Sequence, residues 1–208
     1  LGVIKWEAPV PPQLSGKVKG SFPGFIPKTD EERIQNIGEV LSGFYVTEKL
    51  DGTSVTYFKK DGVFGVCSRN LELLDNDGTQ WKLARVHNLV EALPDNFALQ
   101  GEIVGEGIQK NPYKIKGQKV YFFSAYNIAS GIYLSFQDFK QLCETLKVNT
   151  VPILDENFTL PNSVEVMLEY AVGESALASA TEREGVVVRP RTEMQYKGQR
   201  FSFKAISN

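Results

Sequence analysis

The stretch GFYVTEKLDGTSVTYFKKDGVFGVCSR, residues 43–69, decides the fold class. It contains three short runs rich in β-branched and aromatic residues, and Asp61-Gly62 separates the second run from the third. Such runs are typical of strands, and an Asp-Gly pair between two of them predicts a tight hairpin turn. We therefore expect antiparallel strands here.

Downstream of this stretch, helix and strand patterns alternate. Residues 97–105 and 120–128 have strand composition, whereas capping sequences and apolar spacing predict helices from Ser135 and between Ser163 and Val172. Residues 79–93 also have helical spacing, with an expected inward face of Leu83, Val86, Leu89, Val90 and Leu93.

The C-terminal part, EGVVVRP at 184–190 and RFSFKAIS at 200–207, predicts an antiparallel hairpin with a turn around 195–198. Strand alternation would place Glu184 on the same face as Val186 and Val188. The fold class is therefore α+β, with antiparallel β-sheets and packed helices.

The N-terminal residues suggest two segments. Residues 1–28 are rich in Pro, Gly and Lys and predict an extended lead-in or linker that does not pack, while residues 29–208 form the main domain. Thr29-Asp30-Glu31-Glu32 matches a capping box, which predicts a helix that continues to Gly43.

Composition excludes several classes of protein. The 208 residues are 42% hydrophobic with a formal net charge of -2, so any basic nucleic-acid surface must be local. The single histidine excludes a Ser-His-Asp triad and a histidine-rich zinc site, and the two cysteines fit free core thiols. Without a signal peptide or a membrane-length apolar run, we expect a soluble intracellular protein.

A set of polar residues at strand ends carries the candidate chemistry. Lys49-Leu50-Asp51-Gly52 can present an amine beside a tight turn, although an ordinary surface lysine before an Asp-Gly turn would give the same tetrad. The ordered combination with Ser68-Arg69-Asn70, Glu102, Glu184 and Lys204 supplies a nucleophile, acids and cations. Nucleotidyl transfer requires these parts.

The segments EKLDGTS, SRN, LQGEIVG, FSAYNI, EGVVVRP and FSFKAIS resemble, in order and spacing, the motifs of the covalent nucleotidyltransferases. That superfamily includes ATP-dependent DNA ligases, RNA ligases and mRNA capping enzymes. The resemblance runs from about Phe44 to the C-terminus and is greatest to nick-sealing RNA ligases. It implies an ATP-grasp-like, DNA-ligase-type nucleotidyltransferase domain, normally preceded by an OB module.

The resemblance implies that Lys49 takes AMP from ATP with release of pyrophosphate, and that Lys204 neutralises the α-phosphate. Glu48 would bind the adenine amino group and Phe123 would stack on the adenine, although Phe123 could equally be plain core packing.

The remaining roles implied by the resemblance concern phosphate, ribose and metal. Arg69 and Asn70 would contact the phosphate or ribose, Glu102 the ribose or a metal, and Glu184 the catalytic Mg²⁺ or Mn²⁺.

Two positions depart from the family pattern. Ser202 stands where many relatives have a lysine, so Arg189 or Arg200 would have to compensate. Asn127 replaces the usual aspartate after the aromatic strand, which puts a metal role at position 127 in doubt.

The expected partner is nucleic acid, specifically a nicked duplex with RNA on the 3′-hydroxyl side. Two basic stretches could contact its backbone, one within 108–119 and one at the C-terminus, although the first could equally be a solvated loop. By the same resemblance the protein is a monomer.

The alternatives are a DNA ligase, a capping nucleotidyltransferase, and a nucleic-acid-binding relative that has lost catalysis. The absence of P-loop and Rossmann fingerprints disfavours conventional kinases and dinucleotide oxidoreductases.

Overall fold

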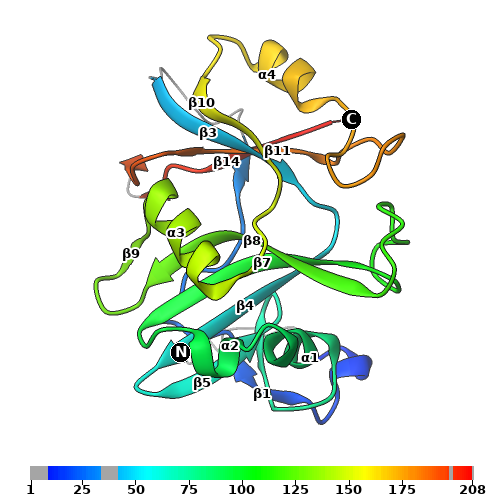
Figure 1. The fold of residues 1–208 in the computed structure, drawn as a ribbon, viewed down its shortest axis with the longest axis vertical. Coiled ribbons are helices and arrows are strands. Elements are labelled where there is room, and N and C mark those ends of the chain that lie inside the picture. The colour runs from blue at the N-terminus through cyan, green and yellow to red at the C-terminus, as the bar shows by residue number, and fades with distance from the viewer. Residues whose placement is uncertain (1–8, 34–41, 197–198, 208) are drawn as a thin grey trace, which may run out of the picture.

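The computed structural model describes residues 9–33, 42–196 and 199–207. This part of the chain forms a seven-stranded sheet, a five-stranded sheet, a two-stranded ribbon and four α-helices. The seven-stranded sheet lies in the lower half of Figure 1 and the five-stranded sheet in the upper half. The expected α+β class is confirmed. Every neighbouring strand pair is antiparallel except β14 with β2.

The seven-stranded sheet contains the hairpin expected at Asp61-Gly62. Both turn residues have positive φ, 53° and 75°, as a tight two-residue hairpin requires. The strands, in spatial order, are β1 (Val18–Ser21), β6 (Leu71–Leu73), β5 (Val63–Cys67), β4 (Thr53–Lys60), β7 (Phe97–Gly105), β8 (Gln118–Asn127) and β9 (Ile132–Tyr133).

The five-stranded sheet contains the expected C-terminal hairpin, in which Val187 pairs with Lys204. Its strands, in spatial order, are β10 (Ile153–Thr159), β3 (Ser42–Lys49), β11 (Gly185–Pro190), β14 (Phe203–Ile206) and β2 (Glu32–Arg33). The ribbon consists of β12 (Gln195–Tyr196) and β13 (Gln199–Arg200).

Two of the expected helices begin at the predicted caps. α3 (Phe136–Leu146) follows Ser135, whose hydroxyl accepts the Asp138 N–H, and α4 (Val164–Ala171) follows Ser163, whose hydroxyl accepts the Val166 N–H. A short 3₁₀ helix covers Pro12–Leu14. No helix in the described ranges is long and apolar enough to span a bilayer.

The single helix expected over 79–93 is wrong. The chain forms α1 (Thr79–Val86) and α2 (Leu89–Ala92), separated by Asn88, which adopts a left-handed conformation at φ 54°. Asparagine tolerates this conformation better than most residues. As a consequence, Val86 is 68% exposed instead of facing the core.

The predicted capping box does not start a helix at Thr29. Residues 34–41 lie outside the described residues, but Glu32–Arg33 forms β2, parallel to β14. The two acidic residues between Thr29 and Glu32 bind arginines from other parts of the fold: Asp30 pairs with Arg69 and Glu31 with Arg189.

The lead-in packs more closely than expected. Residues Val18–Ser21 form the edge strand β1, which pairs with β6. Ile26 is buried in a small apolar cluster with Phe58, Cys67 and Ala98. The Pro and Gly content of residues 1–28 predicted an extended segment and gave no sign of this packing.

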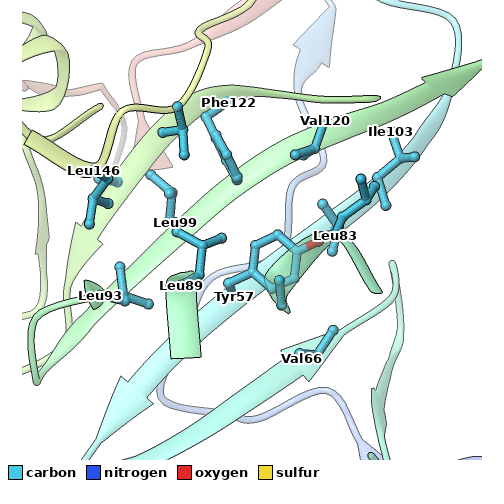
Figure 2. Close-up of a cluster of buried hydrophobic side chains, with 14 of the residues drawn as sticks. Tyr57, Val66, Leu83, Leu89, Leu93, Leu99, Ile103, Val120, Phe122 and Leu146 are labelled. Carbon is cyan, nitrogen blue, oxygen red and sulfur yellow. The ribbon is translucent and has the colours of Figure 1, made fainter. Parts of the chain in front are cut away.

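Among the described residues, helices pack on one face of each sheet. Tyr57, Leu99 and Phe122 lie in the core between the seven-stranded sheet and α1, α2 and α3 (Figure 2). A second core joins the five-stranded sheet to α4 through Val186, Val188 and Met167. Because side chains alternate along a strand, the neighbouring residues of both sheets point away from these cores.

Candidate active site

A cavity of about 370 Å³ lies where β3 of one sheet passes into β4 of the other. Thr47, Val187 and Lys204 of one sheet, and Glu102 and Phe123 of the other, line it from the faces that point away from the helices. The lining consists of Thr29, Asp30, Glu31, Thr47, Glu48, Lys49, Leu50, Asp51, Gly52, Thr53, Ser54, Arg69, Glu102, Gln109, Phe123, Val151, Glu184, Val187, Arg189 and Lys204. The structure thus brings together seven of the eight sequence-predicted site residues.

Lys49 ends β3, and its ammonium group forms an ion pair with the Glu184 carboxylate. The two side chains are 25% and 29% exposed, so the pair lies at the cavity wall and remains open to a ligand. Residues 135 positions apart in the sequence meet here because β3 and β11 are neighbours in the sheet.

The strand alternation predicted for Glu184 is wrong. Val186 and Val188 face the α4 core, whereas Val187 lines the cavity opposite Lys204. Glu184 nevertheless reaches the cavity because Gly185, at φ 157°, interrupts the alternation. A Cβ at Gly185 would lie 2.2 Å from the Ala205 carbonyl oxygen, so only glycine fits.

Gly52 has a comparable constraint on the other side of Lys49. A Cβ at Gly52 would lie 2.3 Å from the Ile103 carbonyl oxygen and 2.8 Å from the Glu102 Cγ. The close approach of these backbones explains why the Lys-Leu-Asp-Gly tetrad ends in glycine.

Several buried polar atoms of the lining lack a hydrogen-bond partner. Within the described residues these are Thr47 Oγ1, Glu48 Oε1, Ser54 Oγ, Glu184 Oε2, and the Arg189 Nε and Nη1 atoms. All five residues line this cavity. Buried polar groups are normally satisfied, so this concentration indicates that a polar ligand completes the site.

The Glu48 carboxylate has one oxygen atom with a hydrogen-bond partner and one without. The side chain is 1% exposed, and its Oε2 atom accepts the Ala176 N–H at 2.8 Å. This contact fixes the carboxylate and leaves Oε1 without a partner. The group can therefore accept one hydrogen bond from a donor in the cavity.

Glu102 on β7 occupies the opposite wall. Burial raises the pKa of its carboxyl to about 8; the nearby Lys49 lowers it, and the Glu184 carboxylate raises it further. A raised pKa of this kind, caused by burial and by charged neighbours in a cavity, is typical of functional sites.

The raised pKa of Glu102 predicts a pH-dependent stability. The folded chain retains a proton that the unfolded chain releases, so stability falls as pH rises from the ordinary value of 4.5 to about 8. Glu102→Gln should remove this fall. Urea unfolding of both proteins in EDTA at about pH 5 and about pH 8 measures it, and parallel losses of stability in both would contradict it.

Phe123 is at the cavity, and not simply packed in the core. Alternation along β8 places Phe122 in the core with no exposure, while Phe123 is half-buried and lines the cavity. The Arg189 guanidinium lies 5.3 Å from the Phe123 ring centroid. An aromatic ligand in the cavity could stack on the Phe123 ring.

Arg69 and Asn70 differ in position. Arg69 lines the cavity and pairs with Asp30 at 2.6 Å, with both side chains largely exposed. Asn70 is not in the lining, and its Oδ1 atom accepts from Lys28. Asn127 also lies elsewhere, where it accepts the Ser130 N–H in a turn.

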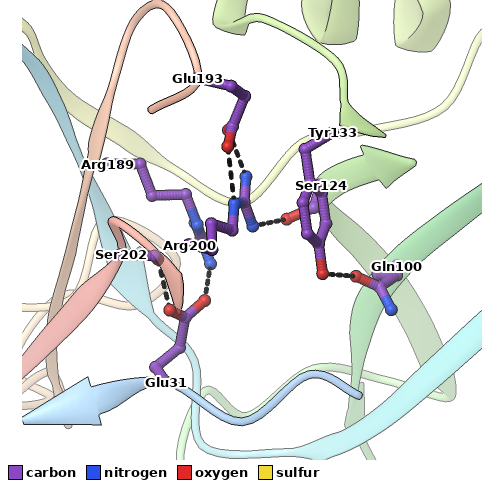
Figure 3. Close-up of polar contacts among 8 residues, drawn as sticks. All are labelled: Glu31, Gln100, Ser124, Tyr133, Arg189, Glu193, Arg200 and Ser202. Atoms are coloured by element: carbon purple, nitrogen blue, oxygen red, sulfur yellow. Dashed lines mark hydrogen bonds and ion pairs between the residues drawn. The ribbon is translucent and has the colours of Figure 1, made fainter. Parts of the chain in front are cut away.

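The network around Ser202 shows which arginine is close to the site (Figure 3). Glu31 accepts from both Ser202 and Arg189, and Arg189 lines the cavity. Arg200 instead binds Glu193 at 2.6 and 3.0 Å and lines an adjacent cavity of about 410 Å³. Of the two candidates to compensate for the missing lysine, only Arg189 is in the lining.

Sequence reasoning missed several members of the lining. Thr47 could have been found, because it lies two residues before Lys49 on the same strand face. Ser54 and Val151 carry no such signal. Glu31 could not be found because its contacts span 158 and 171 positions of sequence.

A family model described as RNA ligase matches residues 42–206. A search of curated proteins found no match.

Solved structures of a Naegleria gruberi RNA ligase match the whole fold. The ligase with pyrophosphate has a TM-score of 0.84 at 42% identity, covering 99% of this chain and 63% of that chain. An alanine variant with ATP and Mn has a TM-score of 0.85 at 42% identity, covering 98% and 62%. Another with AMP and Mn has 0.84 at 42% identity, covering 99% and 63%.

The fold and the lysine-centred cavity define the class of covalent nucleotidyltransferases. Within that class, the chain belongs to the RNA ligase family. It spans less than two thirds of the length of the ligase chains that it matches.

Proposed function

We propose that this chain is the adenylyltransferase part of an ATP-dependent RNA ligase and that Lys49 carries AMP. The observation that carries the proposal is the Lys49–Glu184 pair in a cavity whose unsatisfied polar atoms fit a nucleotide. Lys49 Nζ would form a bond to the α-phosphorus of ATP, and the bond to the bridging oxygen would break to release pyrophosphate. The Naegleria gruberi ligase structures with ATP, AMP and pyrophosphate support this assignment.

The adenine would lie between Phe123 and the aliphatic side chains of Val187 and Val151, which line the same cavity. Its amino group would donate to Glu48 Oε1, the carboxylate oxygen that has no partner. Guanine presents a carbonyl oxygen at the corresponding position, which Glu48 would repel. This contact therefore favours ATP over GTP.

The phosphates would lie toward Lys204 of β14 and Arg69 of the β5–β6 connection, two of the cations in the lining. Glu184 Oε1 holds the Lys49 ammonium group and is the nearest recorded acceptor for the proton that the amine must lose before attack. Arg189 adds positive charge behind Phe123 and partly replaces the cation missing at Ser202.

The donor set fits a divalent cation, Mg²⁺ or Mn²⁺. Glu184 Oε2 has no hydrogen-bond partner, and Glu102 faces the same cavity, so two carboxylates could hold the ion. Such an ion would supply positive charge against the triphosphate. The described residues contain no group of three or more His, Cys, Asp or Glu side chains around one position, so phosphate and water oxygens would complete its shell.

The later steps are part of the same proposal. AMP would pass from Lys49 to a 5′-phosphate end, and a 3′-hydroxyl would then displace AMP to seal a nicked duplex that contains RNA. An OB module of the same protein would help to hold the duplex. Residues 29–208 would suffice for the first step, in a monomer.

The test compares ATP with GTP, and formation of lysyl-AMP with sealing of a nicked duplex. With ATP and Mn²⁺ or Mg²⁺, the chain should acquire one covalent AMP, whereas GTP should give little product; sealing of a nicked duplex should be weak. Labelling by GTP in preference to ATP would support a capping-type enzyme and contradict the proposal. Strong sealing by these 208 residues would overturn the dependence on an OB module.

A further inference from the structure

The connection between β7 and β8, residues 106–117, extends beyond both sheets at the right of Figure 1. Together with the start of β8 it carries four exposed lysines and no acidic residue after Glu106. These are Lys110, Lys114, Lys116 and Lys119. No ion pair is recorded for any of them within the described residues. The basic stretch is thus a local positive patch on a chain with net charge -2.

The backbone of this loop has a defined shape. Gln109, Lys110, Asn111 and Lys114 all have positive φ, between 44° and 58°. The Asn111 side chain donates to the Ile115 carbonyl at 2.9 Å and accepts the Ile115 N–H at 3.0 Å. Left-handed non-glycine residues are costly and cluster at functional sites, which argues against an ordinary solvated loop.

The inner side of the same loop contacts the turn that carries Lys49. Tyr113 is buried at 4% exposure, and its hydroxyl accepts the Asp51 N–H at 2.6 Å. Gln109 donates to the Gly52 carbonyl at 3.3 Å. The loop therefore holds two successive residues of the Lys-Leu-Asp-Gly turn.

Tyr113 also packs behind the candidate nucleotide site, outside its lining. It packs in one cluster with Leu50, Val104 and Val151, against which Phe123 also packs. The Thr181 hydroxyl donates to the Pro112 carbonyl at 3.2 Å and fixes the loop from the opposite side. A displacement of the loop would therefore move the turn that carries Lys49.

We propose that the outer lysines of this loop bind the phosphate backbone of the polynucleotide, and that Tyr113 is a positioning residue that couples this contact to Lys49. The inference rests on the proposed function. Lysines act as point charges, which suits sequence-independent phosphate contacts. The loop thus places the substrate strand and the nucleophile turn in one rigid unit.

The contact of the loop with nucleic acid is tested by replacing its four exposed lysines with glutamine. The matched control replaces Lys59, Lys60, Lys140 and Lys147, which removes the same charge elsewhere. The loop variant should bind a nicked duplex about tenfold more weakly at low salt, with a smaller salt dependence, and should still form lysyl-AMP within about twofold. Equal affinity and salt dependence of the loop variant and its control would overturn this half of the proposal.

The coupling between the loop and the turn at Lys49 is tested by Tyr113→Phe, which removes the acceptor of the Asp51 N–H. We expect the rate of lysyl-AMP formation to fall about tenfold while the KM for ATP changes by less than about twofold, because Tyr113 holds the turn and does not touch the nucleotide. The matched control is Tyr57→Phe, which removes a buried hydroxyl that donates to the Gln80 carbonyl, away from the turn. It should lose thermal stability and keep the rate.

The outcomes separate the two proposals. If the unmodified chain forms no lysyl-AMP, the proposed function fails. If it forms lysyl-AMP and Tyr113→Phe behaves like Tyr57→Phe, with lower Tm and an unchanged rate, the coupling through Tyr113 fails and the proposed function stands.

Discussion

Lys49→Arg is expected to abolish transfer of AMP to the protein, with a loss of at least about a thousandfold in rate. Arginine keeps the positive charge opposite Glu184, so the ion pair and the fold are retained. Its guanidinium stays protonated at any pH that proteins tolerate, and therefore it has no free electron pair for attack on phosphorus. The measurement is a denaturing gel after incubation with α-labelled ATP.

The control for this variant is Lys140→Arg. Lys140 also pairs with a glutamate, Glu156, but on the surface between α3 and β10. The control should label like the unmodified chain. Acid-labile label on the Lys49→Arg chain at a comparable level would show that another residue is the nucleophile.

Glu184→Gln is expected to slow lysyl-AMP formation by at least about a hundredfold. Glutamine keeps the size of the side chain but removes the charge that pairs with Lys49, the acceptor for its proton and an oxygen ligand for a divalent ion. Stability should change little, because both partners are partly exposed and such pairs contribute at most about 1 kcal/mol. Single-turnover labelling and thermal melting measure the two effects.

Glu156→Gln serves as the matched control, since it makes the same chemical change in an ion pair outside the cavity. Its labelling rate should be normal. A Glu184→Gln chain that labels as fast as this control would show that Glu184 takes no part in the reaction.

The predictions that succeeded rest on local information. The strand runs around Lys49, the Asp61-Gly62 turn and the caps at Ser135 and Ser163 all depend on neighbouring residues. The site could be assembled from the sequence because Lys49, Glu102, Glu184 and Lys204 lie in short segments that resemble the motifs of the covalent nucleotidyltransferases. The pairings of β3 with β11 and of β4 with β7, which bring these segments together, join distant parts of the chain.

The predictions that failed depend on conformation or on distant contacts. Asn88 divides a helix through one left-handed residue, and Gly185 reverses the expected face of Glu184 through one unusual φ. The Thr29–Glu32 segment has an ideal capping sequence, but Arg69 and Arg189 bind its carboxylates from other parts of the fold. Tertiary contacts of this kind override local propensity.

The most direct test of the central claim is to identify the residue that carries AMP. After incubation with ATP and Mn²⁺, the unmodified chain should be digested at neutral pH and its peptides analysed by mass spectrometry. We expect a single AMP on the peptide that contains Lys49, lost on brief acid treatment. AMP on a different peptide, or no AMP at any metal concentration, would contradict the account.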